Sequence, residues 1–215
     1  MTDAILTALR HTDRVAAALA QRILSGAWSE DDKLPADTAL CAEFDVSRTV
    51  IREALRLLSG KGLIIAVPRR GTHVEKRQNW ALWDKDVLNW LANIDLDNNK
   101  YDFSADALDM RLALEPTLAA LAAARANDAD NHALQDALRQ LQHHADAPTH
   151  AAFLGCFYAA AHNGFAIAAL PLAAYALSHR QTTPPLDAYR RLTAAIAQKD
   201  GSLARQAALQ AILSD

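Results

Sequence analysis

Apolar residues recur at helical spacing in three stretches near the start of the chain. The first stretch has Val15, Leu19 and Ile23 on one stripe, which predicts a helix that Gly26 ends. A tight turn at residues 45–46 separates the second and third stretches, and Ser47 is a favourable N-cap residue for the third. The predicted helices span residues 13–25, 36 or 37–44, and 48–59.

A short hairpin is expected directly after the third helix. Residues 63–67, Leu-Ile-Ile-Ala-Val, have the composition of a strand, and residues 72–74 can return as its partner. Residues 68–71, Pro-Arg-Arg-Gly, supply the turn between them. Two helices, a turn, a third helix and a hairpin are, in this order, the elements of a winged helix-turn-helix, whose last helix lies in the major groove of DNA.

The rest of the chain is expected to be helical. Residues 78–93 carry Trp80, Trp83 and Trp90 and predict a short helix packed between two bodies. Pro171 is expected to kink a later helix or to delay its start. The six predicted helices of this part cover residues 105–126, 129–145, 150–162, 166–178, 186–198 and 202–213. Six antiparallel helices make a bundle, which can enclose a ligand cavity.

The predicted fold class is therefore mainly α, in three parts. These parts are a winged helix-turn-helix domain (three helices plus a β-hairpin) over residues 1–77, an interdomain segment over 78–103 and an all-α antiparallel bundle over 104–215. The hydrophobic fraction of 51% is enough for a sizeable core. The most apolar stretch, residues 151–177, is interrupted by His162, Asn163 and Pro171. We therefore expect no membrane span and a cytoplasmic location.

The charge of the chain is unevenly distributed. The net charge of −3 does not by itself favour a nucleic-acid partner. Residues 1–78, however, contain 12 Lys and Arg against 10 Asp and Glu, whereas the remainder contains 10 against 15. Within residues 47–77 there are 8 basic residues and only 2 acidic ones. This asymmetry is typical of a DNA-binding head on an acidic body.

The N-terminal end of the third helix carries residues expected to meet DNA. Arg48 and Arg52 are four residues apart and share a helix face, and arginine can contact guanine O6 and N7 with two hydrogen bonds. Ser47 and Thr49 offer hydroxyl groups that suit phosphate. The alternative is a solvated helix face on which the arginines pair with Glu53.

The hairpin behind this helix favours the DNA interpretation. Arg69 and Arg70 lie at its predicted tip beside Gly71, which lets the backbone approach DNA closely or places an arginine in the minor groove. The expected partner is therefore double-stranded operator DNA. The predicted contacts are Ser47, Arg48, Thr49, Arg52, Arg69, Arg70 and Gly71.

The same residues carry a resemblance to the GntR family of bacterial regulators. The matching runs within residues 10–77 are Leu34-Pro35-Ala36-Asp37, residues 40–44, residues 46–55, Gly62-Leu63-Ile64 and residues 70–74. The resemblance implies a sequence-specific regulator and, by family habit, a repressor. Most members have an acidic and then a basic residue soon after the Leu-Pro pair. Here these positions are Asp37 and Thr38, so one arginine contact of the family is missing.

The second half of the chain resembles the FCD effector domain of the FadR-type branch. Residues 83–90, Trp-Asp-Lys-Asp-Val-Leu-Asn-Trp, are similar to the interdomain segment of members that sense sugar acids such as galactonate. The runs Arg-Leu-Ala-Leu-Glu-Pro at 111–116, Ala122-Ala123 and His162-Asn163 resemble the domain's signature. The resemblance implies control by a small organic or sugar acid.

Many FCD domains hold a divalent metal with one aspartate and three histidines, and the metal helps to grip a carboxylate ligand. Aligned on His162-Asn163, the aspartate position falls on His150. The three histidine positions fall on Leu154, Tyr189 and either Ala211 or Ile212. The usual residue is replaced at each position, so we expect no metal and no other cofactor.

Arg111 is the candidate for an effector's carboxylate, because a guanidinium can bind it with two hydrogen bonds. The alternative is an intrahelical pair with Glu115 at i,i+4 spacing. His150 and Asn163 are further candidates for effector contact, and the alternative for Asn163 is a position that simply ends its helix.

A homodimer is expected, because one winged head contacts few bases and a two-fold dimer reads a palindrome. Two other functions are open to the bundle. It could serve only as a dimerisation module without metal or effector, which the missing ligands favour. It could also be a small enzyme, but the sequence offers no Ser/His/Asp cluster and no HExxH motif, so we expect no enzymatic activity.

Overall fold

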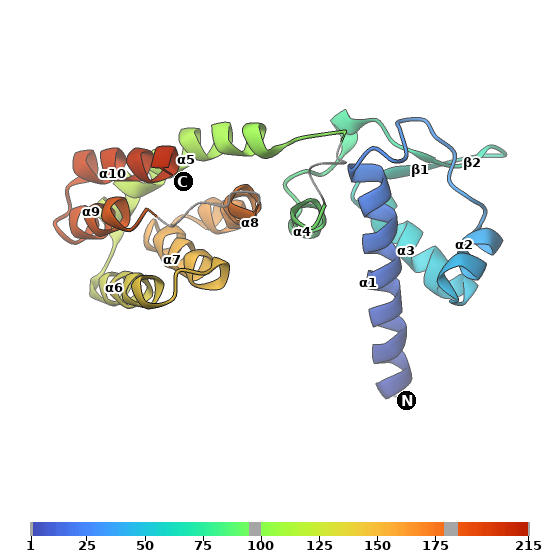
Figure 1. Cartoon of the computed structure of the whole chain (residues 1–215), viewed down its shortest axis with the longest axis horizontal. Coiled ribbons are helices and arrows are strands. Elements are labelled where there is room, and N and C mark those ends of the chain that lie inside the picture. The colour runs from blue at the N-terminus through green and yellow to red at the C-terminus, as the bar shows by residue number, and fades with distance from the viewer. Residues whose placement is uncertain (1, 95–99, 179–184, 215) are drawn as a thin grey trace. The chain divides into compact units, whose positions relative to one another are not determined.

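The computed structural model describes residues 2–94, 100–178 and 185–214. Within these residues the chain forms two compact units, Met1–Asp102 and Phe103–Asp215, and each is described here by itself (Figure 1). The predicted fold class is confirmed, since an N-terminal set of helices with a two-stranded hairpin precedes a purely helical unit.

The first unit begins with a helical core. Its helices are α1 (Thr2–Leu24), α2 (Asp37–Phe44) and α3 (Arg48–Gly60). Helix α1 starts well before residue 13, where it was expected, because residues 2–12 contain no Pro or Gly to stop it. The stripe Val15, Leu19 and Ile23 is fully buried, as are Ile51 and Leu58 of α3, which packs against α1. Apolar burial of these stripes therefore fixes the orientation of α3.

The wing of the first unit is wider than the sequence suggested. Strands β1 (Ile64–Val67) and β2 (Gly71–Val74) pair antiparallel, with Ile64 opposite Val74. Residues 31–34 run along the free edge of β2: the Leu34 amide donates to Thr72 O over 2.9 Å, and the Val74 amide donates to Asp32 O over 2.9 Å. The connector between α1 and α2 thus pairs with β2 and widens the wing.

The tryptophan-rich segment is not one continuous helix. A 3-10 turn, η1 (Arg77–Asn79), is followed by helix α4 (Lys85–Ala92), which begins at Lys85 because the Asp84 side chain accepts hydrogen bonds from the Asp86 and Val87 amides. Trp80 is buried and donates through Nε1 to Glu75 O over 2.9 Å. Helix α4 packs against α1, so this segment is part of the first unit.

The second unit is an array of antiparallel helices. Among the described residues it contains the six helices expected from the sequence: α5 (Ser104–Arg125), α6 (Asp128–His143), α7 (Ala147–Ala160), α8 (Gly164–Ser178), α9 (Leu186–Ala197) and α10 (Gly201–Ser214). Helix α8 continues through Pro171 from Gly164, so the proline does not delay its start. Capping boxes at Asn127 and Asp146 satisfy free amides at the starts of α6 and α7.

One apolar core joins the helices of the second unit. Alanine fills much of it, and the large members include Phe153, Phe157, Tyr158, Tyr189 and Leu192. Small alanine side chains let the helices approach closely, while the aromatic rings fill the wider spaces. In the described part of the chain, no helix is both long and apolar enough to cross a membrane.

Candidate nucleic-acid interface and candidate effector core

Helix α3 presents a polar N-terminal end and an apolar inner side. Val50 and Ile51 are buried, while Arg48, Thr49 and Arg52 are exposed. Ser47 has extended backbone and its Oγ accepts a hydrogen bond from the Val50 amide over 3.4 Å. The Ser47 N-cap, which starts the helix at the next residue, therefore places the two arginines and Thr49 on the solvent side of its first turns.

The arginines of α3 differ in their partners. Arg52 Nε lies 3.6 Å from Asp37 Oδ2, and the Arg52 side chain is 77% exposed. Arg56 Nε lies 3.0 Å from Glu53 Oε2 on the same helix. Within the described ranges Arg48 forms no ion pair. Exposed pairs of this kind contribute only about 0–1 kcal/mol, so phosphate or a base edge can replace the carboxylate at little cost.

The tip of the wing is basic and has an unusual backbone. Arg69 has φ 63° and Gly71 has φ 100°, while the Arg70 amide donates to Val67 O over 3.0 Å and closes the turn. Positive φ is easy for glycine and costly for a branched or bulky residue. Pro68, Arg69 and Arg70 are all exposed, so the turn holds two guanidinium groups out from the strands.

Lys33 is a basic residue at the wing that sequence reasoning missed. It is exposed and forms an antiparallel bridge with His73 on the edge of β2. A Cβ atom placed on Gly71 would lie 3.0 Å from Lys33 Cε, so the lysine side chain crosses the wing beside that glycine. The sequence of residues 31–34 predicts only a connector. Their pairing with β2 joins segments that are far apart in the chain, and no local sequence pattern indicates it.

Some of the basic residues counted in the sequence form ion pairs within the first unit. Lys61 Nζ lies 2.6 Å from Asp84 Oδ1 and 2.8 Å from Asp86 Oδ2. Burial alone would lower the pKa of Lys61, but hydrogen bonds to these two carboxylates outweigh it and raise the pKa above its ordinary value. Arg77 Nε lies 3.3 Å from Glu30 Oε1. The basic surface is thus narrower than the sequence count implied, and it centres on α3 and the wing.

The second unit contains a buried polar cluster on α5 and α7. Arg111 Nε donates to Glu115 Oε1 over 2.6 Å and Arg111 Nη2 to Oε2 over 3.3 Å, so the intrahelical pair considered from the sequence is present. Both residues are at most 2% exposed. Tyr158 Oη donates to Glu115 Oε1 over 3.0 Å. Burial, followed by the charge of Glu115, raises the pKa of Tyr158 far above its ordinary value, so the phenol remains a donor.

A second polar contact crosses the same core between α7 and α9. His150 Nε2 and Tyr189 Oη are 2.5 Å apart, and the ring of Phe153 lies 4.4 Å from that of Tyr189 between centroids. Burial, and then the positive charge of Arg111, lowers the pKa of His150 to about 4. His150 is therefore neutral near pH 7 and takes part in a neutral hydrogen bond.

The remaining candidate residue, Asn163, lies between α7 and α8. It is half-buried, and its Oδ1 accepts a hydrogen bond from the Phe165 amide over 3.0 Å. This contact satisfies a free amide at the start of α8. Asn163 therefore has a capping contact, while Arg111 and His150 both lie in the core.

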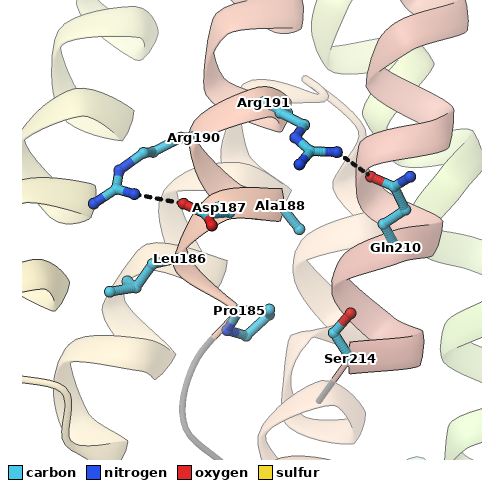
Figure 2. A pocket seen from close by; sticks show the side chains of 8 residues that line it. All are labelled: Pro185, Leu186, Asp187, Ala188, Arg190, Arg191, Gln210 and Ser214. Atoms are coloured by element: carbon cyan, nitrogen blue, oxygen red, sulfur yellow. Dashed lines mark hydrogen bonds and ion pairs between the residues drawn. The ribbon is translucent and has the colours of Figure 1, made fainter.

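An open groove lies elsewhere on the second unit, between α9 and α10 (Figure 2). It encloses about 640 Å³ and its lining includes Pro185, Asp187, Arg190, Arg191 and Gln210. In Figure 2 the two arginines point away from each other: Arg190 Nη1 reaches Asp187 Oδ1 at 2.6 Å, and Arg191 Nη1 reaches Gln210 Oε1 at 3.1 Å. Both guanidinium groups of this groove therefore have a partner on the surface, a carboxylate for Arg190 and a neutral amide for Arg191.

Two segments of the chain match known families. Residues 11–74 match the family described as "Bacterial regulatory proteins, gntR family", and residues 106–214 match the FCD domain. The matches cover the winged unit and the helical unit respectively, which are the two parts described above.

Two curated proteins of Escherichia coli (strain K12) illustrate the similarity along the chain. The galactonate operon transcriptional repressor is 32% identical over 225 residues, which cover 96% of this chain and 95% of that repressor. The putative L-lactate dehydrogenase operon regulatory protein is 32% identical over 124 residues, which cover 57% of this chain and 45% of that protein.

Solved structures share the fold. A GntR protein of Streptococcus agalactiae has 25% sequence identity and a TM-score of 0.50, with 94% of this chain and 97% of that chain covered. Lar, which controls the expression of the Listeria monocytogenes agr system, has a TM-score of 0.58 at 16% identity, with 94% and 93% covered. At that identity the likeness concerns the fold alone.

Proposed function

The chain belongs to the GntR family of bacterial regulatory proteins and carries an FCD domain, and from this premise we propose that it is a repressor that binds operator DNA as a homodimer and responds to a small organic acid. Family membership makes it a transcriptional regulator and not an enzyme. The observation that carries the DNA assignment is the pairing of an exposed Arg48–Arg52 face on α3 with the arginine-tipped wing.

The proposed DNA contact divides the work between two elements. The first turns of α3 enter the major groove, where Arg48 and Arg52 read base edges and Thr49 contacts the backbone. Arg69 and Arg70 of the wing, with Lys33 beside them, meet phosphates or the minor groove. Because chromosomal DNA is the partner, the regulator acts in the cytoplasm.

A gel shift with a sequence selected from genomic fragments tests this assignment. Arg48→Ala should lower specific affinity by about 5- to 150-fold for each half-site, the equivalent of roughly 1–3 kcal/mol for each bidentate base contact. Arg139→Ala is the matched control, because Arg139 is an exposed arginine on α6 paired with a neighbouring carboxylate. If Arg48→Ala and Arg139→Ala bind the selected sequence equally well, Arg48 reads no base.

The proposed effector is a sugar acid or a related small carboxylate. The similarity to a galactonate operon repressor over 96% of the chain supports this class. The buried Arg111 is the proposed carboxylate partner, since guanidinium binds carboxylate in a bidentate geometry. Glu115 already occupies two of its nitrogens, so a ligand carboxylate would have to compete with Glu115 or bind beside it.

A second candidate function for the bundle is dimerisation without an effector. This function is favoured because these polar side chains of the packed core already have partners. His150 bonds to Tyr189, and Glu115 bonds to Arg111 and Tyr158. The choice can be made by adding galactonate or L-lactate to the protein–DNA complex. Release of DNA together with a higher unfolding midpoint supports the effector. If millimolar acid neither releases the DNA nor raises the unfolding midpoint, the dimerisation module is favoured.

A further inference from the structure

The core of the second unit contains the positions at which metal-binding FCD domains would carry their ligands. These positions are His150 and Leu154 on α7, Tyr189 on α9 and Ala211 on α10. All four are buried, at 7%, 1%, 1% and 2% exposure respectively. Leu154, Tyr189 and Ala211 belong to one apolar core, and His150 bonds to Tyr189 within it, so the donor atoms at these positions decide whether a metal fits.

The donor atoms at this place do not suit a divalent ion. Zinc sites in proteins use at least three nitrogen, sulfur or oxygen ligands from the chain. Leu154 and Ala211 end in methyl groups and supply none. Tyr189 Oη and His150 Nε2 are only 2.5 Å apart and hydrogen-bonded to each other. Across the described ranges, no three His, Cys, Asp or Glu residues come together in a way that could hold a metal.

The charge of the surrounding cluster also disfavours an added cation. The carboxylate of this cluster, Glu115, is already held by Arg111 and by Tyr158. One guanidinium and one carboxylate balance each other, and both are almost fully buried. A divalent ion would add two positive charges with no anionic ligand to offset them, and an unpaired buried charge is strongly unfavourable.

We propose that this chain has a metal-free effector core, in which the His150–Tyr189 hydrogen bond takes the place of the metal and Arg111, held by Glu115, is the guanidinium available to an acid that displaces or joins that carboxylate. The metal-free core holds whether or not an acid binds there. Only the role of Arg111 toward a ligand rests on the proposed function. If an acid does bind, its binding is independent of divalent ions.

The test begins with wild-type protein purified without a histidine tag. Elemental analysis should find well under one equivalent of Zn²⁺, Ni²⁺ or Mn²⁺ per chain. The unfolding midpoint should not change when one of these ions or EDTA is added. Stoichiometric metal that His150→Ala removes would overturn the proposal.

A reversal variant provides the positive control. The combined changes His150→Asp, Leu154→His, Tyr189→His and Ala211→His restore the ligand set of the metal-binding type. This variant should take up about one Zn²⁺ per chain and gain a higher midpoint with Zn²⁺. A variant that folds but binds no Zn²⁺ would show that the core geometry, not the four residues, excludes metal, which contradicts the proposal.

Tyr189→Phe tests the positive part of the proposal. Removal of its hydroxyl leaves His150 without its partner, so the midpoint should fall by about 2–8 °C. An unchanged midpoint would mean that the His150–Tyr189 contact does not hold the core together. These measurements use DNA-free protein, so their failure is distinct from a failure of the gel shift, which tests the regulator assignment.

Discussion

Individual side chains in the helical unit combine burial with ionisable chemistry, and His150 is the clearest case. It is buried, shares a hydrogen bond with Tyr189 and is within the electrostatic influence of Arg111, and burial and then this charge lower its pKa. A protonated imidazole would be buried beside a guanidinium, which is unfavourable. The folded chain therefore resists protonation at this residue, and the stability of the unit depends on pH.

The folded chain should lose stability between pH 6.5 and pH 4 because of His150. The unfolded chain takes up a proton near pH 6.5, whereas the folded chain does so only near pH 4. Stability is therefore unaffected by this group above pH 6.5, and falls as the pH drops, by about 3 kcal/mol at pH 4.

Urea unfolding of wild type and His150→Gln across this range measures the effect. The variant cannot titrate at this position, so its stability should fall less steeply with acid. His132→Gln, at an exposed position on α6, is the control and should follow wild type. Equal slopes for all three proteins would contradict the assignment of the acid sensitivity to His150.

Two glycines at the end of α3 should respond differently to the same substitution. Gly62 has φ +68°, and a Cβ atom there would lie 2.1 Å from Asn79 O. Gly62→Ala should therefore lower the unfolding midpoint of the first unit by roughly 5 °C or more, through strain and a clash with the backbone. Gly60, in the last turn of α3, has open space around it, so Gly60→Ala should be neutral or stabilise by up to about 1 kcal/mol. A thermal melt in which both variants behave alike would contradict this account.

At the scale of elements, the wing adds charge to the DNA contact of α3. Each phosphate that a basic side chain neutralises adds about 0.9 to the slope of log affinity against log salt concentration. The double variant Arg69→Ala/Arg70→Ala should weaken binding and flatten this slope by about 0.9 for each phosphate that is no longer neutralised. Fluorescence anisotropy between about 50 and 200 mM salt measures it. Arg139→Ala/Arg205→Ala, at exposed positions of the helical unit, should keep the wild-type slope.

Elements with strong local signals could be predicted from the sequence. The order of helices and hairpin followed from apolar periodicity, and Ser47 marked the start of α3 correctly. Contacts between distant residues carried no such signal. Lys61 reaches Asp84 and Asp86, which are 23 and 25 residues away, and Lys33 joins the wing through pairing with β2. The sequence therefore could not show which of its basic residues face solvent without a carboxylate partner, because contacts between distant residues decide this.

The residues of the candidate core could be predicted from the sequence better than the contacts between them. The Arg111–Glu115 spacing was visible in the sequence and the pair is present, whereas the replacement of the family's metal ligands stays a prediction. The hydrogen bond between His150 and Tyr189 was not visible, because it joins two helices whose relative rotation depends on the packing of the whole core. The DNA-contact and effector residues themselves remain predictions until the variants are measured.

At the scale of the whole molecule, the proposed regulator should bind as two chains on one duplex. A palindromic operator places its half-sites on the same side of the DNA, and two heads can then bind together. Native mass spectrometry should find two chains per duplex. Inserting about 5 bp between the half-sites turns them to opposite sides and should reduce affinity to that of one half-site. Two chains bound with unchanged affinity after the insertion would contradict a two-fold dimer.

The contacts of Lys61 also determine where this chain can be recombined with others. Lys61 follows α3 and binds Asp84 and Asp86 at the start of α4, while its carbonyl accepts a hydrogen bond from the Ala81 amide over 3.0 Å. A chimera cut after the wing, near residue 77, would leave a half-buried lysine without its two carboxylates. A junction at the boundary between Asp102 and Phe103 keeps these contacts within the transplanted head. Hybrid regulators built from this chain should therefore carry α4 together with the head.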